Sequence, residues 1–529
     1  MHSKITMNQS PHPVLRTLGF MALLMVIGGA FLFRPNSNAI PDNLLPRWED
    51  VLPATPQMSS AQAIDLLNAY DGGLRVDTAR APLESSLESR TSPLPAVLQA
   101  RGKQLAFSAG DTSAYDRTGI GQFLHSNLQF QGTSSAFQAL GTFFQALDES
   151  DRRPPLHVLH FGDSQIEGDR ITGHLRQAWQ SIWGGSGPGL ISPLQPVPSL
   201  AMRQTWSGDW VRYTRYGKKD STLSHDRFGL MAAFATGELR DPNQANAAEL
   251  GDRTIRFTPH PKGFQQNASF NELHLLLGRS TDTTTVHYRL NDGPETSIRI
   301  APDPLGQHVT VSLDALDSSQ YTSLDLRFSG EVPELNGVGF WKDSGIVVHN
   351  IAMRGSSGTL FRSLDRMHLQ RQLQSLRTGL VILQYGGNAV PYLEDSLACE
   401  RYGNWFASQI QLFQSILPHV PIVVIGPSDM ARKQDTRMET YPQLVMVRDA
   451  LLHAALSNNA LYWDVFEVMG GAGSMAAWVQ ADPPLASSDH VHFTPRGAKE
   501  MAELFRKSMQ AEWALWQNAQ VEKILVHAR

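Results

Sequence analysis

The nine residues His157–Gln165, HVLHFGDSQ, place a strand, a tight turn and a serine in direct succession. The run His157–Phe161 follows two prolines and predicts a short strand, which continues straight into Gly162-Asp163-Ser164-Gln165. A helical pattern begins a few residues later. A strand that leads directly into a helix is the repeating unit of parallel α/β sheets. A serine at such a turn projects from the carboxyl edge of the sheet.

The same alternation of short apolar runs and amphipathic helices recurs in the second half of the chain. Further strands are predicted at Ile346–Ile351, Leu380–Tyr385, Ile422–Ile425 and Leu461–Val465, and helices near Ile171–Ile182, Thr359–Leu376, Leu397–Ile416, Gln443–Leu456 and Thr494–Trp516. Strands that are apolar on both faces are typical of a parallel sheet with helices on both sides. The sequence therefore predicts a doubly wound, five-stranded α/β domain with its reactive groups at the carboxyl ends of the strands.

The stretch from about 194 to 338 interrupts this alternation. Strand-like runs occur at Leu273–Leu277, Thr284–Leu290, Thr296–Ile300, His308–Leu313 and Ser323–Phe328. Turn-forming segments such as Asn291-Asp292-Gly293 separate them. This pattern predicts an antiparallel β-sandwich inserted between the first and second strands of the α/β domain.

Aromatic side chains gather in the first part of this insertion, at Trp206, Trp210, Tyr213 and Tyr216. Aromatic rings are suited to stacking on sugar rings, so Trp206 and Trp210 are candidate substrate-binding residues. The alternative is that they are core or interface aromatics.

The whole chain is expected to have five parts. These are a signal-anchor helix at 1–34, a Pro-rich linker at 35–60, an N-terminal helical extension at 61–150, an α/β catalytic domain formed by 151–199 and 339–529, and the β-sandwich insertion at 200–338. Within the extension, helices are predicted near Ala61–Tyr70 and from Ser134 to Leu147.

The N-terminal segment indicates export. The uncharged run Thr17–Phe33 follows Lys4 and Arg16 and ends at Arg34. As a helix it would be about 25 Å long, enough to cross a thin bilayer as a retained anchor. The alternative is a cleaved signal peptide with Ser37-Asn38-Ala39 at the cleavage site. We expect the body of the protein to be periplasmic or otherwise extracytoplasmic, anchored to the cytoplasmic membrane or secreted after cleavage.

Composition excludes several classes of protein. The 529 residues are 41% hydrophobic, which is typical of globular domains and excludes global disorder. With 45 basic and 50 acidic side chains the net charge is −5, which argues against nucleic acid as the main partner. The single cysteine, Cys399, excludes an intrachain disulfide and a CxxC zinc site.

The segment SDHVHFTP, Ser488–Pro495, lies just before the last long helix. An aspartate three residues before a histidine on a loop can reach Nδ1 of the ring and leave Nε2 free to act as a base. Asp489 and His492 fit this description. A metal site of Asp489, His490 and His492 is the alternative, although no fourth ligand is evident.

Two further segments follow predicted strands. Gly355 comes after the second strand, and Gly386-Gly387-Asn388 comes after the third. A glycine N–H and an asparagine amide donate hydrogen bonds without bringing a charge, as the oxyanion of acyl transfer requires. The alternatives are a plain turn at Gly355, a helix cap at Asn388, and a helix cap at Ser164.

Together these segments resemble the SGNH (or GDSL) hydrolases, a superfamily of serine esterases named for Ser, Gly, Asn and His in four blocks. The matching residues are the nucleophile Ser164, the glycine Gly355, the oxyanion residue Asn388, and the pair Asp489 and His492. The resemblance covers 155–195 and 340–515. It implies a flavodoxin-like sheet and an oxyanion hole made by the backbone N–H groups of Ser164 and Gly355 and the Asn388 amide. Two positions depart from the family: Gln165 replaces leucine, and Ala389 stands where many members have aspartate.

The β-rich insertion, the stretch HNIAMRGSSG at 349–358 and the expected export are similar to bacterial peptidoglycan and exopolysaccharide O-acetylesterases. In those enzymes the insertion resembles a carbohydrate-binding module. The resemblance implies a serine esterase that acts on an acetylated polysaccharide without a cofactor or metal. The alternatives are an O-acetyltransferase supplied by a membrane-bound O-acyltransferase, and a non-catalytic glycan-binding envelope protein. The inner membrane is a further expected partner, through the N-terminal helix; nucleic acid is not.

Overall fold

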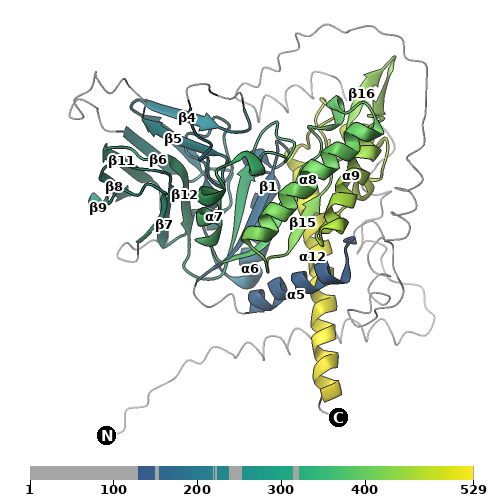
Figure 1. Ribbon diagram of the computed structural model, residues 1–529, viewed down its shortest axis with the longest axis horizontal. Coiled ribbons are helices and arrows are strands. Elements are labelled where there is room, and N and C mark those ends of the chain that lie inside the picture. Colours follow the sequence, from purple (N-terminus) through teal and green to yellow (C-terminus); the bar gives the residue numbers. More distant parts are fainter. Residues whose placement is uncertain are drawn as a thin grey trace. The chain divides into compact units, whose positions relative to one another are not determined.

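The computed structural model describes residues 129–148, 154–217, 220, 223–237, 253–313 and 321–527. These residues form a five-stranded parallel sheet, a six-stranded and a five-stranded antiparallel sheet, and a two-stranded hairpin (Figure 1). The predicted anchor, the Pro-rich linker and the predicted helix near 61–70 lie outside the described residues. Within the described part, no helix is both long and apolar enough to cross a membrane.

The parallel sheet consists of β1 (Leu156–Gly162), β13 (Ile346–Ala352), β14 (Thr378–Gln384), β15 (Ile422–Ile425) and β18 (Leu461–Trp463). Its spatial order is β13-β1-β14-β15-β18, and all neighbouring strands are parallel. Every residue of β1 is buried, as expected for a strand that is covered on both faces. The predicted α/β fold with a five-stranded parallel sheet is confirmed, and the order is that of flavodoxin-like sheets.

The sheet is flanked by helices on both faces. They are α5 (Ser134–Asp148), α6 (Thr172–Trp183), α7 (Arg366–Gln374), α8 (Ser396–Ile416), α9 (Leu444–Ser457) and α12 (Pro495–His527). The chain moves from β1 to β13 in one direction along the sheet, and from β14 through β15 to β18 in the other. Because the crossovers are right-handed, α6, which follows β1, lies on one face of the sheet and α8 and α9 lie on the other. Aromatic pairs such as Phe143–Trp179 and Trp183–Trp513 join α5, α6 and α12. Helices α7, α8 and α9 share a hydrophobic core with β1 and β14.

One predicted helix is divided in the structure. The pattern at 359–376 predicts a single helix, but a 3-10 turn η6 (Phe361–Ser363) precedes α7. The Asp365 carboxylate accepts a hydrogen bond from the His368 N–H (2.9 Å) and therefore caps the start of a new helix.

The predicted strand at 461–465 is shorter than expected. It ends at Trp463, because Asp464 caps the following helix by accepting a hydrogen bond from the Glu467 N–H (3.3 Å). The sequence pattern also does not predict several short elements, namely α10 (Val465–Met469), α11 (Ser474–Gln480), and the hairpin of β16 (Ala431–Gln434) and β17 (Arg437–Thr440).

The two large antiparallel sheets lie between β1 and β13 in the chain. One contains β10 (Gln307–Ser312), β7 (Glu272–Leu277), β12 (Leu335–Trp341), β5 (Ala233–Gly237) and β4 (Trp210–Thr214) in this order, with β2 (Gly189–Ile191) paired to β12. The other contains β3 (Arg203–Ser207), β6 (Arg253–Thr258), β11 (Leu324–Gly330), β8 (Thr284–Leu290) and β9 (Thr296–Ile300). Side chains of both sheets, such as Phe257 and Phe340, share one hydrophobic core. The five strands predicted in this region correspond to β7 to β11.

Four histidines surround Trp341 where the parallel sheet meets β7, β10 and β12. We call His157, His274, His308 and His349 the histidine cluster. The rings of His274 and Trp341 stack with centroids 3.7 Å apart. Nδ1 of His157 lies 2.8 Å from Nε2 of His349, and Nδ1 of His274 lies 3.0 Å from Nε2 of His308. Burial lowers the pKa of His157 and His274 to about 3 and that of His308 to about 4, so the cluster is neutral at pH 7.

Candidate active site

The predicted site segments meet at one edge of the parallel sheet. Gly162, at the end of β1, lies opposite Ala352 at the end of β13 and opposite Gln384 at the end of β14. The three strands therefore end at the same level, and the loops that follow start side by side. These loops carry Ser164, Gly355 and Asn388. In a sheet with this strand order, the topological switch point lies between β1 and β14, and ligands bind at such a point in open α/β folds.

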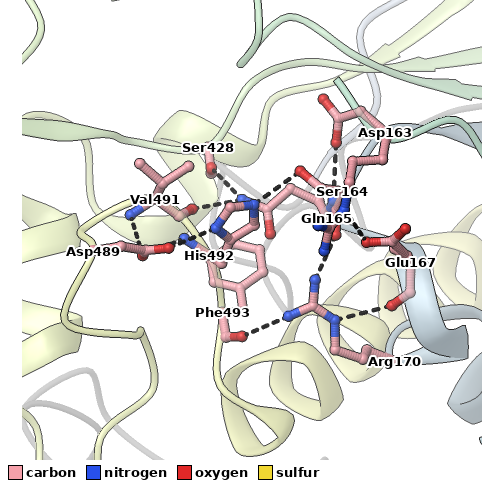
Figure 2. Close-up of polar contacts among 11 residues, drawn as sticks. Asp163, Ser164, Gln165, Glu167, Arg170, Ser428, Asp489, Val491, His492 and Phe493 are labelled. Atoms are coloured by element: carbon pink, nitrogen blue, oxygen red, sulfur yellow. Dashed lines mark hydrogen bonds and ion pairs between the residues drawn. The ribbon is translucent and has the colours of Figure 1, made fainter. Parts of the chain in front are cut away.

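Ser164, His492 and Asp489 form one hydrogen-bonded chain (Figure 2). Oγ of Ser164 lies 2.8 Å from Nε2 of His492, and Nδ1 of His492 lies 2.6 Å from Oδ2 of Asp489. When Nδ1–H donates to the carboxylate, Nε2 carries the lone pair and accepts the serine hydroxyl hydrogen. This arrangement can take the proton from Ser164 as its oxygen attacks an electrophile.

The Asp489 carboxylate is held by its own loop. Its Oδ1 accepts hydrogen bonds from the N–H groups of Val491 (2.9 Å) and His492 (3.0 Å). Burial acts to raise the pKa of Asp489, but the hydrogen bond and charge of His492 and the two backbone N–H groups outweigh it, and the pKa lies below its ordinary value of 3.8. The group therefore stays anionic at neutral pH and can stabilise a positively charged imidazole ring.

The turn after Ser164 is anchored by a buried ion pair. Arg176 on α6 donates to both carboxylate oxygens of Asp169 at 2.7 and 2.8 Å, and Thr172 donates to the same carboxylate at 2.6 Å. Such a two-pronged, buried pair fixes geometry as well as charge. Because α6 begins at Thr172 with Ile171 at its N-cap, Ser164 does not cap that helix.

Asp163, the residue before the serine, interacts directly with Asn388. The Asp163 carboxylate accepts hydrogen bonds from the Gln165 N–H (2.9 Å) and from Nδ2 of Asn388 (2.9 Å), and burial raises its pKa to about 6. The same Asn388 nitrogen also donates to the Ser356 carbonyl (3.2 Å). An amide nitrogen carries two hydrogens, so an oxyanion could bind Asn388 only by sharing or replacing one of these bonds. Asn388 is not the cap of the following 3-10 turn, whose N-cap is Ala389.

Gly355 lies in the loop that follows β13. Its φ angle of +76° falls in the left-handed region that favours glycine, whereas a Cβ at this position would meet no atom within 4 Å. The backbone conformation rather than space therefore favours glycine here. The preceding residue, Arg354, forms an ion pair with Glu167 (2.7 Å), which ties this loop to the turn after Ser164.

Two side chains outside the predicted site join the serine segment to the histidine loop (Figure 2). Nε2 of Gln165 donates to the carbonyl of Val491 at 2.6 Å. Arg170 donates from Nη1 to the carbonyl of Phe493 at 3.1 Å, and from Nη2 to the carbonyl of Ser164. The sequence carries no local pattern that predicts these contacts.

The metal alternative does not fit the geometry. His492 uses both ring nitrogens in the hydrogen bonds to Ser164 and Asp489, so neither remains for a metal ion. In the part of the chain that the structure describes, no three His, Cys, Asp or Glu side chains are grouped so that they could hold one.

The predicted aromatic residues differ in their surroundings. Trp206 on β3 is 45% exposed and can meet a ligand. Trp210 on β4 packs edge-to-face on Phe328 (5.6 Å) and donates its indole N–H to the Thr254 carbonyl (3.3 Å). Tyr213 is buried. Trp210 and Tyr213 thus have packing roles, and Trp206 is the better candidate for binding a sugar.

The structure is similar to that of a peptidoglycan O-acetylesterase, with a TM-score of 0.55, 20% sequence identity, and coverage of 71% of this chain and 96% of that chain. Weaker matches include a salicylyl-acyltransferase from a tetracycline biosynthetic pathway (12% identity, 61% and 96% coverage, TM-score 0.25) and an acetyl xylan esterase (15% identity, 31% and 81% coverage, TM-score 0.25). No family model and no curated protein sequence matches the chain. The first match shows a shared fold.

Proposed function

We propose that this protein is a serine esterase that removes O-acetyl groups from a cell-envelope polysaccharide, either peptidoglycan or an exopolysaccharide. The observation that carries the proposal is the hydrogen-bonded chain of Ser164, His492 and Asp489 at the carboxyl edge of the sheet. Ser164 and His492 are 328 residues apart in the chain, so local structure does not bring them together. Asp489 orients the histidine and completes the arrangement used in nucleophilic catalysis.

The reaction would proceed by two acyl transfers. Nε2 of His492 takes the proton from Oγ of Ser164 while this oxygen adds to the acetyl carbonyl carbon, and Asp489 stabilises the imidazolium. The tetrahedral intermediate collapses, the sugar oxygen leaves with the proton from His492, and the acetyl group stays on Ser164. Water then adds to the acyl-enzyme with His492 again as base, and acetate and free serine result.

The negative oxygen of each intermediate would be stabilised by the backbone N–H groups of Ser164 and Gly355, with the Asn388 amide as a third donor. One such donor typically contributes about 3 kcal/mol to the transition state. We expect Asn388 to contribute less than this, because Asp163 and Ser356 already accept hydrogen bonds from its nitrogen.

Two observations support a polysaccharide as substrate. The chain shares its fold with a protein described as a peptidoglycan O-acetylesterase. In addition, the antiparallel sheets present the exposed Trp206, and an indole ring offers a flat apolar face to a sugar.

We also propose that the enzyme acts outside the cytoplasm, held at the inner membrane by its N-terminal segment. The support is the uncharged run Thr17–Phe33 between basic residues. Fractionation of cells that produce the full chain tests this part separately: recovery in the cytoplasmic fraction would contradict it and leave the chemistry untouched.

Acetate release from O-acetylated peptidoglycan and from O-acetylated xylan tests the function, with and without a glycan acceptor. We expect the full chain to release acetate from at least one polymer, and the Ser164→Ala variant to release it at least about 1000-fold more slowly. Acetyl transfer to the added acceptor in place of release would favour the transferase. Binding to the polymers without turnover, and without labelling of Ser164 by a fluorophosphonate, would favour a glycan-binding protein.

A further inference from the structure

The residues on both sides of His492 in the chain have backbone carbonyls that accept hydrogen bonds from the segment that follows Ser164. Val491 and Phe493, the chain neighbours of His492, accept hydrogen bonds from Gln165 and Arg170 respectively (Figure 2). The donors lie one and six residues after Ser164. Each side of the catalytic histidine is therefore tied to the segment that carries the nucleophile.

Arg170 contacts the backbone of Ser164 and that of Phe493, the residue after His492. Besides the Phe493 carbonyl, its guanidinium donates to the carbonyl of Ser164 and, from Nε, to that of Glu167 (3.0 Å). A guanidinium is planar and its five donors have fixed directions. One rigid group thus sets the distance between the backbone at the nucleophile and the backbone at the histidine.

The orientation of the Gln165 amide is fixed by the same contact. Its nitrogen faces the Val491 carbonyl, while its Oε1 is buried without a hydrogen-bond partner among the described residues. If the amide were turned over, Oε1 would face the carbonyl oxygen of Val491, and two acceptors would repel each other. Leucine, which is usual at this position in the resembling family, could not make the bond at all.

Other backbone hydrogen bonds of the histidine loop run within the loop or to neighbouring segments. The N–H of Ser487 donates to the carbonyl of His492 (2.8 Å), which is a bond within the loop, and the N–H of Ala431 donates to the carbonyl of His490 (3.1 Å). Neither bond reaches the serine segment. The contact between Ser164 and His492 depends on a short distance, and a displacement of about 1 Å at a reacting group can lower a rate about 100-fold.

We infer that Gln165 and Arg170 are positioning residues that together hold His492 at reacting distance from Ser164. This inference rests on the proposed esterase function. It gives a function to Gln165, which replaces the leucine of the family pattern. It also adds Arg170, a residue that lies outside the four motifs.

The test compares Gln165→Met, Arg170→Met and Arg170→Lys with two matched controls. Gln204 donates to the Ser192 carbonyl (2.9 Å), and its buried Oε1, like that of Gln165, has no hydrogen-bond partner within the described ranges. Arg212 donates to the Pro193 carbonyl (3.1 Å), as Arg170 does to its carbonyls. Gln204→Met and Arg212→Met therefore make the same chemical change on the antiparallel sheets.

Two rates are measured in the full chain, namely hydrolysis of a small aryl acetate and labelling of Ser164 by a fluorophosphonate. We expect each methionine variant at 165 and 170 to lower kcat and the labelling rate by about 10- to 100-fold, with KM changed by less than about threefold. Arg170→Lys should recover part of the loss, because an ammonium group can still reach one carbonyl. The controls should react as the unchanged protein does.

The possible failures are distinguishable. If the unchanged protein hydrolyses no ester and its Ser164 is not labelled, the proposed function is wrong. If it reacts and the variants at 165 and 170 react at the same rate, the positioning inference alone is wrong. If Arg170→Met does not fold, as circular dichroism would show, Gln165→Met and Arg170→Lys still decide the matter.

Discussion

Acid should unfold this protein at a pH well above that at which most carboxylates are protonated. Four of the histidines that are almost fully buried in the described part of the chain have strongly lowered pKa values: about 3 for His157 and His274, about 4 for His160, and well below 6.5 for His349. Burial is the first cause in each case. In the unfolded chain the same groups titrate near 6.5. Below that pH the unfolded chain binds protons that the folded chain does not, so stability falls as the pH falls.

Two buried carboxyl groups act in the opposite direction. Burial raises the pKa of Asp163 and Asp464 to about 6, above the ordinary value of 3.8. Between about pH 6 and pH 4 the folded chain therefore binds these two protons first, which partly offsets the histidines. Near pH 5 these four histidines and two carboxyl groups together leave the unfolded chain with about two protons more, which lowers stability by about 3 kcal/mol per pH unit. His308, with a pKa of about 4, adds to this fall. Since domains are stable by about 5–15 kcal/mol, two pH units remove a large part of the total.

Urea unfolding at about pH 7.5, 6 and 5 measures this slope. His157→Gln should make it shallower by about 1.4 kcal/mol per pH unit, because one buried imidazole is removed. Glutamine keeps the necessary acceptor: the Leu190 N–H donates to Nδ1 of His349 (2.9 Å), so Nε2–H of His349 must donate to residue 157. His419→Gln, at an exposed position, is the control and should leave the slope unchanged. A stability that stays constant down to pH 5, or a slope that His157→Gln does not alter, would refute the reasoning.

Four substitutions test the site itself, each on a small aryl acetate and on polymer. Ser164→Ala should lower hydrolysis at least about 1000-fold with the urea midpoint unchanged, and activity within tenfold of the original would contradict the serine assignment. Asp489→Asn should lower kcat about 10³- to 10⁴-fold, because the amide cannot hold the required tautomer of His492; an unchanged kcat would show that Asp489 is dispensable. Asn388→Ala should lower kcat less than about 100-fold, and a larger loss would mean that its amide leaves Asp163 and Ser356 during the reaction. Trp206→Ala should raise KM for polymer and leave the small ester unaffected, whereas equal losses on both would exclude a role in polymer binding.

The parallel sheet could be predicted because its strands are buried on both faces. Runs such as Ile422–Ile425 are apolar at every position, and that property can be recognised without knowing any neighbour. The antiparallel sheets were predicted only in part, since β12 (Leu335–Trp341) is rich in glycine and buried at all seven positions, and the edge strand β3 alternates little in burial. In such strands the order of apolar and polar residues depends on how the strand packs against the other sheets. The same is true of Trp206 and Trp210, since their neighbours in the fold decide which of them is exposed.

The residues of the site also divide into those that can be recognised locally and those whose role depends on the folded chain. Ser164, Asp489 and His492 carry chemistry in their residue types. Ser164 directly follows a predicted strand, and Asp489 lies three residues before His492, so both segments could be found in the sequence. Gln165 and Arg170 act through bonds to the carbonyls of Val491 and Phe493, which are more than 300 residues away and would be equally good acceptors in any residue type. A contact to a backbone carbonyl leaves no requirement on the side chain at the accepting position. The supporting bonds of an active site are therefore the part that only the folded chain reveals, and here they lie on both sides of its base.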